Sequence, residues 1–307
     1  MSTPSNAFLG SFDSRGAAPA TVSSTRSFFW SVRREFWEHR SLYIAPLAAA
    51  SLFLFGLIIS LIHLPSRMRA AGVGPMQHDF LDHSENLAAL LIMATTLIVA
   101  LFYCLDALYG ERRDRSILFW KSLPVSDLTT VLSKASIPIV ILPLLTFAVT
   151  IALWILMILL SNAVLLASGM STPAATPHLS FFQLSIGLFY HLMVVHGLFY
   201  APFYGWALLV SAWARRAAFL WATVPPLAIG IVERVAFNTS YFASMLGYRV
   251  GGGAEDSNSK AADMAVAFMP HFTSGQLFFN PSLWTGLAVT AIFLAVATRL
   301  RRNREPI

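Results

Sequence analysis

Charged residues are scarce in this chain, and that scarcity limits what the protein can be. Asp, Glu, Lys and Arg make up 12% of the 307 residues, whereas 56% of the residues are hydrophobic. Soluble globular domains carry roughly 25% charged residues, about twice as many, because their surfaces must be hydrated. The composition therefore excludes an ordinary soluble protein and favours a protein that lies in a membrane.

Lysine and cysteine are also nearly absent. The three lysines are Lys121, Lys134 and Lys260, and none follows the G-x-x-x-x-G-K-[ST] pattern that surrounds nucleotide phosphates. Cys104 is the one cysteine, so no intrachain disulfide can form. The chain also lacks the G-x-S-x-G and H-E-x-x-H motifs. We therefore expect no catalytic residue, bound cofactor or metal site, and expect the chain not to be an enzyme.

The sequence contains several long apolar runs without charged residues. Several reach the ~20 residues that a hydrocarbon core of about 30 Å requires, and they show no polar stripe. The fold expected is an all-α membrane domain over residues 42–300 with six spanning helices. The predicted spans are 42–64, 86–110, 128–160, 183–212, 217–237 and 281–300.

Prolines mark the places where these spans should end or bend. We expect Pro65 to end the first span, and Pro138 and Pro143 to kink the third. The fourth run is too long for one untilted span, which predicts a break around Pro202–Gly205. Pro225–Pro226 should interrupt the fifth span.

The basic residues are distributed unevenly when the spans alternate across the membrane. With the N-terminus inside, 16 of the 21 Lys and Arg residues fall on the cytoplasmic side. This positive-inside bias places both termini in the cytoplasm. The net charge of +6 is then a sign of topology, and we expect no nucleic-acid partner.

Three segments flank or interrupt the spans. Residues 1–24 are expected to be a disordered cytoplasmic tail, and residues 301–307 a basic one. The pattern of residues 25–41 predicts an amphipathic helix with aromatics on one side and arginines on the other. We expect this helix to lie in the plane of the lipid headgroups. The alternative is a plain cytoplasmic extension of the first span. Residues 264–280 should dip into the outer leaflet before the last span.

The inner loop between spans two and three, GERRDRSILFWKSLPVSD, is the most informative segment. Large apolar residues at Ile117–Trp120 follow the charged run 111–115. Exposed apolar residues rimmed by charge favour a protein-binding surface. The alternative is that they fold back onto the membrane interface, where tryptophan is common. Ser126 and Asp127 then offer N-caps for the third span.

Ionisable residues inside the apolar runs are candidates for a functional role. Asp106 lies one turn from the inner end of span two and should form an ion pair with Arg112 or Arg113, with a role in coupling as the alternative. His191 and His196 are five residues apart, so on an α-helix they should face different directions and share no metal.

The six spans, the N-terminal RREFWEHRSL and the loop ERRDRSILFWKSLPVSD together resemble type-2 ATP-binding cassette (ABC) export permeases, over residues 28–302. The resemblance implies a multi-pass subunit of a bacterial cytoplasmic (inner) membrane. Two such subunits, identical or different, pair around a translocation path, and each docks a separate cytoplasmic ATPase that binds ATP and magnesium. The loop 111–127 would be the coupling loop. The implied contact positions are Glu111, Arg112, Arg113, Asp114, Arg115, Ile117, Leu118, Phe119, Trp120 and Lys121, with Arg33, Arg34 and Glu35 in support.

Three functions remain open at the level of sequence. The resemblance favours an ATP-driven transporter, and we expect it to export its cargo. A non-transporting membrane scaffold or sensor would share the fold and the partner loop. An intramembrane hydrolase would need facing catalytic groups, for which the chain shows no motif. The cargo cannot be identified from these residues.

Overall fold

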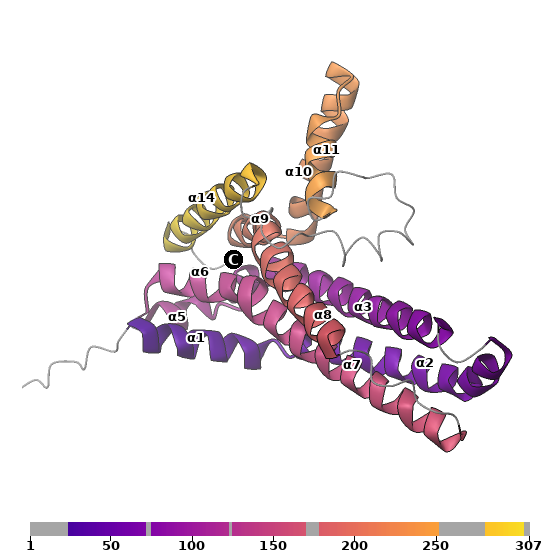
Figure 1. Ribbon diagram of the computed structural model, residues 1–307. Helices are drawn as coiled ribbons and strands as arrows, with labels where there is room; N and C mark the ends of the chain where they lie inside the picture. The colour runs from indigo at the N-terminus through magenta and orange to yellow at the C-terminus, as the bar shows by residue number, and fades with distance from the viewer. Residues whose placement is uncertain (1–23, 72–74, 123–124, 170–177, 252–279, 304–307) are drawn as a thin grey trace, which may run out of the picture.

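The chain is entirely helical over the part that the computed structural model describes, which is residues 24–71, 75–122, 125–169, 178–251 and 280–303 (Figure 1). Some of the α-helices among these residues are joined by π-helical turns, which are labelled η. The elements in chain order are α1 (Ser24–Glu38), α2 (Ser41–Ala71), α3 (Pro75–Ala107), α4 (Tyr109–Arg113), α5 (Ile117–Ser122), α6 (Asp127–Ser136), η1 (Ile137–Ile141), α7 (Leu142–Ala167), α8 (His178–His191), η2 (Leu192–Phe199), α9 (Ala201–Trp213), α10 (Ala218–Val232), η3 (Glu233–Phe237), α11 (Tyr241–Val250) and α14 (Pro281–Asn303).

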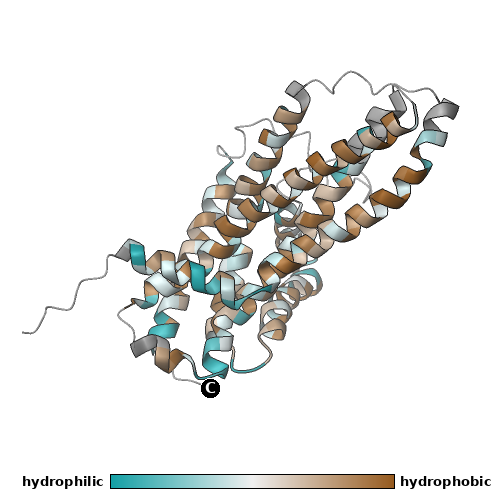
Figure 2. Cartoon of the chain, turned by 90° about the horizontal axis from the view of Figure 1, so that it is seen from below, coloured by the Kyte–Doolittle hydropathy of each residue, from teal (hydrophilic) through white to brown (hydrophobic). Residues whose placement is uncertain are grey.

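Six helical segments are long and apolar enough to cross a membrane, which confirms the predicted number. They are Ser41–Ser66, Ser84–Arg113, Asp127–Ala167, Phe181–Phe199, Ala218–Phe237 and Pro281–Asn303. The long helices are coloured mainly as hydrophobic, while hydrophilic residues gather at the end where the C-terminus lies (Figure 2). The predicted tails 1–24 and 301–307 and the membrane-dipping segment 264–280 lie wholly or largely outside the described residues.

Helix α1 is amphipathic, but its faces are not divided as the sequence predicted. Val32 and Phe36 pack against the main core cluster, whereas Trp30 and Trp37 are exposed. Arg33 lies on the exposed face between the two tryptophans. The prediction that aromatics and arginines occupy opposite sides is therefore wrong, because the residues at i, i+3 and i+7 share one face.

Two of the predicted proline interruptions do not occur. Helix α2 continues through Pro65 to Ala71, and α10 continues through Pro225 and Pro226. A proline inside a helix leaves the carbonyl four residues earlier without its amide partner. For Pro226 that carbonyl belongs to Ala222, and it accepts a hydrogen bond from the Trp206 indole at 3.0 Å. A side chain from α9 thus replaces the lost backbone bond.

The third and fourth spans contain π-helical turns where the sequence predicted bends. The first, η1, includes Pro138 and joins α6 to α7. The second, η2, ends at Phe199, and Tyr200 separates it from α9, whose second residue is Pro202. The two turns touch, because a Cβ on Gly197 would lie only 2.6 Å from the Ile139 carbonyl oxygen. Glycine at 197 is what permits this close crossing of spans three and four.

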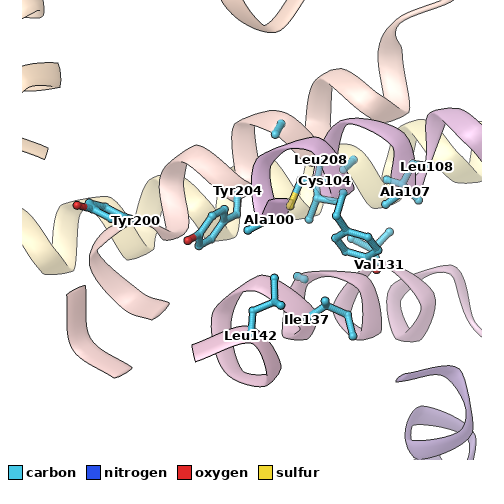
Figure 3. Close-up of a cluster of buried hydrophobic side chains, with 14 of the residues drawn as sticks. Ala100, Cys104, Ala107, Leu108, Val131, Ile137, Leu142, Tyr200, Tyr204 and Leu208 are labelled. Carbon is cyan, nitrogen blue, oxygen red and sulfur yellow. The ribbon is translucent and has the colours of Figure 1, made fainter. Parts of the chain in front are cut away.

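The main hydrophobic core lies where spans two, three, four and six meet (Figure 3). Cys104 and Ala107 of α3 face Ile137 and Leu142 on one side and Leu208 of α9 on the other. A second cluster joins α2, α3, α7 and α8, and includes the fully buried Trp154, whose indole donates to the Glu85 carbonyl at 3.1 Å. The main cluster holds the ends of α3, α6 and α14 in place relative to α1, because Val32 and Phe36 of α1 pack against it.

Candidate functional site: a buried ionic network

Glu35 of α1 lies at the centre of a charged cluster that joins four separate helices. Its Oε1 accepts a hydrogen bond from Lys134 Nζ of α6 at 2.7 Å and one from Arg34 at 2.6 Å. Its Oε2 accepts a hydrogen bond from the Tyr103 hydroxyl of α3 at 3.0 Å, and His39 Nε2 lies 3.7 Å away. The carboxylate is fully buried, so each of its oxygens is held by a partner within the chain.

Glu111 of α4 carries the cluster on to the last span. Its Oε1 lies 3.1 Å from Lys134 Nζ, and its Oε2 lies 3.1 Å from an Arg301 nitrogen of α14. Arg301 also lies 3.6 Å from Asp127 at the first turn of α6, and Arg34 lies 3.5 Å from Glu111. We call the set the ionic network; its members are Arg34, Glu35, Glu111, Asp127, Lys134 and Arg301.

The network balances three acidic against three basic side chains, and four of them are almost wholly buried. Glu35, Lys134, Glu111 and Arg301 each expose less than a tenth of their side chains. Burying one unpaired charge would cost several kcal/mol, so the set is stable only as a whole. Helices α1, α4, α6 and α14 are therefore held to one another through charge.

The pKa of Glu35 reflects this arrangement. Burial by itself would raise the pKa of the carboxyl. The positive charges of Lys134 and Arg34, and their hydrogen bonds, outweigh burial and lower the pKa from 4.5 to about 2. Glu35 is therefore ionised at neutral pH and remains so in mild acid.

A second set of contacts fixes the loop to span four. Arg112 donates to the backbone carbonyls of Ser211 and Ala214, which end helix α9. The Ser211 hydroxyl oxygen accepts hydrogen bonds from the amides of Leu108 and Tyr109, at 2.9 and 2.8 Å. These bonds satisfy backbone groups at the α3–α4 break and at the end of α9. The loop is thus anchored on both of its sides.

The predicted contact positions divide into two groups in the structure. Arg33, Arg113, Asp114, Arg115, Leu118 and Phe119 are exposed, and Arg34 is partly exposed. Glu35, Glu111, Arg112 and Ile117 are buried within the chain. The side chains of Trp120 and Lys121 lie outside the described residues.

Burial changes what three of these positions can do. The expectation that Glu35, Glu111 and Arg112 face a partner disagrees with their burial and with their contacts inside this chain. The charge of these residues led us to expect exposed side chains. In the structure, Glu35 and Glu111 instead form ion pairs, and Arg112 binds backbone carbonyls at the end of α9. Any direct contact with a partner falls to the exposed group, above all to Leu118 and Phe119 of α5.

Asp106 lies close to one of its two expected partners. Its Oδ1 is 4.0 Å from Arg113 Nη1, and both side chains are about half exposed. Arg113 lies closer to Asp114, at 3.0 Å. Because exposed pairs contribute little free energy, Asp106 is peripheral to the ionic network.

Lys134, Arg301 and Asp127 belong to the ionic network but were not predicted as site residues from the sequence. Lys134 was counted only as a cytoplasmic charge, although it stands within an apolar run predicted to span the membrane. A lone lysine at the start of a span signals a buried partner, and this signal was present in the sequence. Its partner Glu35 is distant in sequence, so the pairing itself could not be read from local pattern.

A different charged residue is buried at the opposite end of α14. Arg249 of α11 donates to the carbonyl oxygens of Phe199 at 3.0 Å and Ser282 at 2.6 Å, and its guanidinium lies 5.0 Å from the Phe199 ring centroid. Gly286 makes room for it, since a Cβ there would overlap the guanidinium. We call this the arginine clamp; it ties α11 to η2 and α14 without any carboxylate among the described residues.

Glu233 also has a defined role that the sequence did not indicate. Its carboxylate accepts hydrogen bonds from the amides of Tyr241 and Phe242 and from the Thr239 hydroxyl. These amides belong to the first turn of α11, so Glu233 caps that helix from the end of the fifth span.

His191 and His196 lie together, contrary to expectation. Their ring centroids are 5.3 Å apart, and both side chains are buried. The expectation assumed α-helical spacing, but η2 begins at Leu192, and in a π-helix each amide bonds to the carbonyl five residues back. Residues i and i+5 therefore come close together, and the two rings meet at a tilt of 57°. Among the described residues, no group of three or more His, Cys, Asp and Glu side chains is placed to hold a metal.

Comparisons with models of known protein families, with curated proteins and with solved structures find no match to this chain.

Proposed function

We propose that this protein is the membrane-spanning permease subunit of an ATP-driven exporter, similar to type-2 ABC permeases. A separate ATPase subunit docks on the loop 111–127 and supplies the energy. The observation that supports this most is the ionic network, since it joins that loop to the first and last parts of the membrane domain through buried charge.

The docking surface in this proposal is the exposed side of α5. Leu118 and Phe119 are each more than half exposed, and Ile117 beside them is buried and anchors the helix. Exposed large apolar residues next to charged ones are typical of a protein interface. Helix α5 follows α4 in the chain, and α4 supplies Glu111 to the ionic network.

The ionic network would then carry the movement of the ATPase into the membrane. A push on α5 moves α4, and Glu111 of α4 holds both Lys134 of α6 and Arg301 of α14. Separating any of these pairs would leave a buried charge uncompensated, at a cost of about 3–5 kcal/mol. The helices therefore move together rather than slide apart.

Pairing with a second permease subunit is part of the same proposal. The fifth span buries only 6% of its most apolar window within the chain, against 44% for the second span. Its outer surface is thus left for lipid or another subunit. A cysteine introduced at the exposed Leu227 would cross-link two copies if the subunits are identical, and Cys104 would not interfere because it is buried.

The test is co-purification of this protein with the soluble ATPase that the proposal requires. Leu118→Asp with Phe119→Asp should abolish co-purification while membrane insertion stays normal. The matched control is Val235→Asp with Phe237→Asp, which charges an even more exposed apolar pair of η3 on the predicted outer side. The control should keep the ATPase, and loss of the ATPase in both variants, or in neither, would contradict docking at α5.

The proposal also predicts that the isolated chain neither binds nor hydrolyses ATP. With its ATPase in vesicles, turnover should respond to cargo and accompany flux. Turnover that ignores every cargo and produces no flux would favour a scaffold or sensor instead.

A further inference from the structure

Helix α1 has an exposed face on which arginine and tryptophan alternate. Arg26, Trp30, Arg33, Trp37 and Arg40 follow one another at spacings of four and three residues, and all five are exposed. Residues at such spacings share one face of a helix. Arg40 comes just after α1 ends at Glu38, so the stripe runs along the whole helix and into the turn that follows it.

Two tryptophans hold the central arginine in place. The Arg33 guanidinium carbon lies 5.1 Å from the Trp30 ring centroid and 4.7 Å from that of Trp37. Cation–π contacts of this kind reduce the freedom of the side chain without using its hydrogen-bond donors. Arg33 therefore presents its guanidinium outward in a fixed position.

The chemistry of this stripe matches a phospholipid headgroup. A guanidinium binds phosphate through two parallel hydrogen bonds, and tryptophan is enriched where headgroups meet acyl chains. Exposed Phe29 adds apolar surface beside the stripe. Glu38 of α1 lies 3.5 Å from Arg34, so its charge is paired with a member of the ionic network.

The opposite face of the same helix carries Glu35, which is buried in the ionic network. Arg33 and Glu35 are two residues apart, so a ligand on the exposed face holds the helix that positions the carboxylate. Val32 and Phe36 pack on the main core between the two faces. Whatever binds the stripe thus acts on the network through a short, rigid element.

We propose that the exposed face of α1 is a binding site for anionic phospholipids, whose phosphate is held by Arg33, between the two tryptophans, and by Arg26 one turn before Trp30, and that this binding stabilises the ionic network. The site takes lipid that carries net negative charge and discriminates against zwitterionic lipid. Lipid binding does not depend on the proposed transport function, so either can fail alone.

The experiment is a titration of the purified full-length chain in detergent with phosphatidylglycerol or phosphatidylcholine, followed by native mass spectrometry. Phosphatidylglycerol should bind the native chain more tightly. Each arginine near an anionic surface contributes about a fivefold change in affinity, so Arg26→Gln with Arg33→Gln should weaken phosphatidylglycerol binding by about 25-fold. The rise in thermal unfolding midpoint caused by phosphatidylglycerol should disappear in the same variant.

Two control variants separate a specific site from charge in general. Arg215→Gln with Arg216→Gln removes the same charge from an exposed turn on the same predicted side of the membrane, and should bind as the native chain does. Arg26→Lys with Arg33→Lys keeps the charge but loses the paired hydrogen bonds and the stacking of a guanidinium, so it should bind phosphatidylglycerol more weakly than the native chain and more tightly than the glutamine variant. Equal binding of the two lipids by the native chain, or equal loss in the Arg215/Arg216 variant, would overturn the proposal.

Discussion

The two ends of α14 hold buried charge in different ways. At its C-terminal end, Arg301 belongs to a network in which every charge faces an opposite charge. At its N-terminal end, Phe199 and Ser282 offer uncharged partners to Arg249, namely two carbonyl oxygens, the Ser282 hydroxyl and an aromatic ring. The two ends lie about 28 Å apart at the ~1.5 Å rise per residue of an α-helix, which is close to the thickness of a bilayer core.

The difference indicates which end can transmit a change. In the ionic network, loss of one side chain leaves opposite charges buried without compensation, so its members respond together. In the arginine clamp, loss of the arginine leaves only neutral carbonyls, which costs less and affects fewer helices. We infer that the network end is where a partner would act, and that the clamp mainly fixes the outer helix α11 in place.

The largest effect should come from removing the shared cation of the network. Lys134→Met should lower the free energy of unfolding by about 3–5 kcal/mol, because Glu35 and Glu111 lose their common partner. Denaturation in detergent micelles measures this. Adding Glu35→Gln should recover part of the loss, and a double variant as unstable as the sum of the single ones would show that the two side chains do not interact.

Acid should weaken the network end selectively. The folded-state pKa of Glu35 is depressed from 4.5 to about 2, so its contribution is complete above about pH 4.5 and is lost as pH falls toward 2. The loss should amount to roughly 3 kcal/mol. Unfolding measured from pH 7 to pH 2 in the native chain and in Glu35→Gln separates this residue from other carboxylates, and identical curves would contradict its assigned role.

Removing the cation at the other end should cost less. Arg249→Met should destabilise the protein by about 2 kcal/mol, because the carbonyls of Phe199 and Ser282 lose a charged donor but bury no charge. The destabilisation should change little between pH 7 and pH 4, since Arg249 pairs with no carboxylate among the described residues. A loss equal to that of Lys134→Met would remove the distinction between the two ends.

The smallest effect concerns the space that the clamp requires. Gly286→Ala places a methyl group against the Arg249 guanidinium and should cost roughly 1–2 kcal/mol. Gly187→Ala is the matched control, because a Cβ there meets no atom within 4 Å. Alanine also favours helix over glycine, so the control should be neutral or slightly stabilising. Equal thermal shifts in the two variants would argue against close packing at 286.

The features that follow from local pattern were predictable from the sequence. Uninterrupted apolar length gave six spans, and Ser126 caps α6 as expected, since its hydroxyl accepts a hydrogen bond from the Thr129 amide at 3.1 Å. The break in the fourth span also occurs near the predicted place, at Tyr200. Each of these depends on residues within a few positions of one another.

What the sequence could not supply depends on tertiary contacts. Pro226 is tolerated in α10 only because Trp206 of another helix satisfies the freed carbonyl. Glu35 and Lys134 pair across the fold, so a charged loop gave no sign of which side chains turn inward. The rings of His191 and His196 lie next to each other because a π-helix replaces the α-helix that periodicity assumes.

The most direct test of the account is whether nucleotide moves the helices that the ionic network joins. Spin labels on cysteines introduced at Arg40 and Asn303, with Cys104 buried and unreactive, would report the distance between the ends of α1 and α14 in the complex with the ATPase. We predict that trapping the ATPase with ATP and vanadate shifts this distance by several Å, and that Lys134→Met abolishes the shift while the ATPase stays bound. A shift that persists unchanged in Lys134→Met, or no shift in the native complex, would contradict the account.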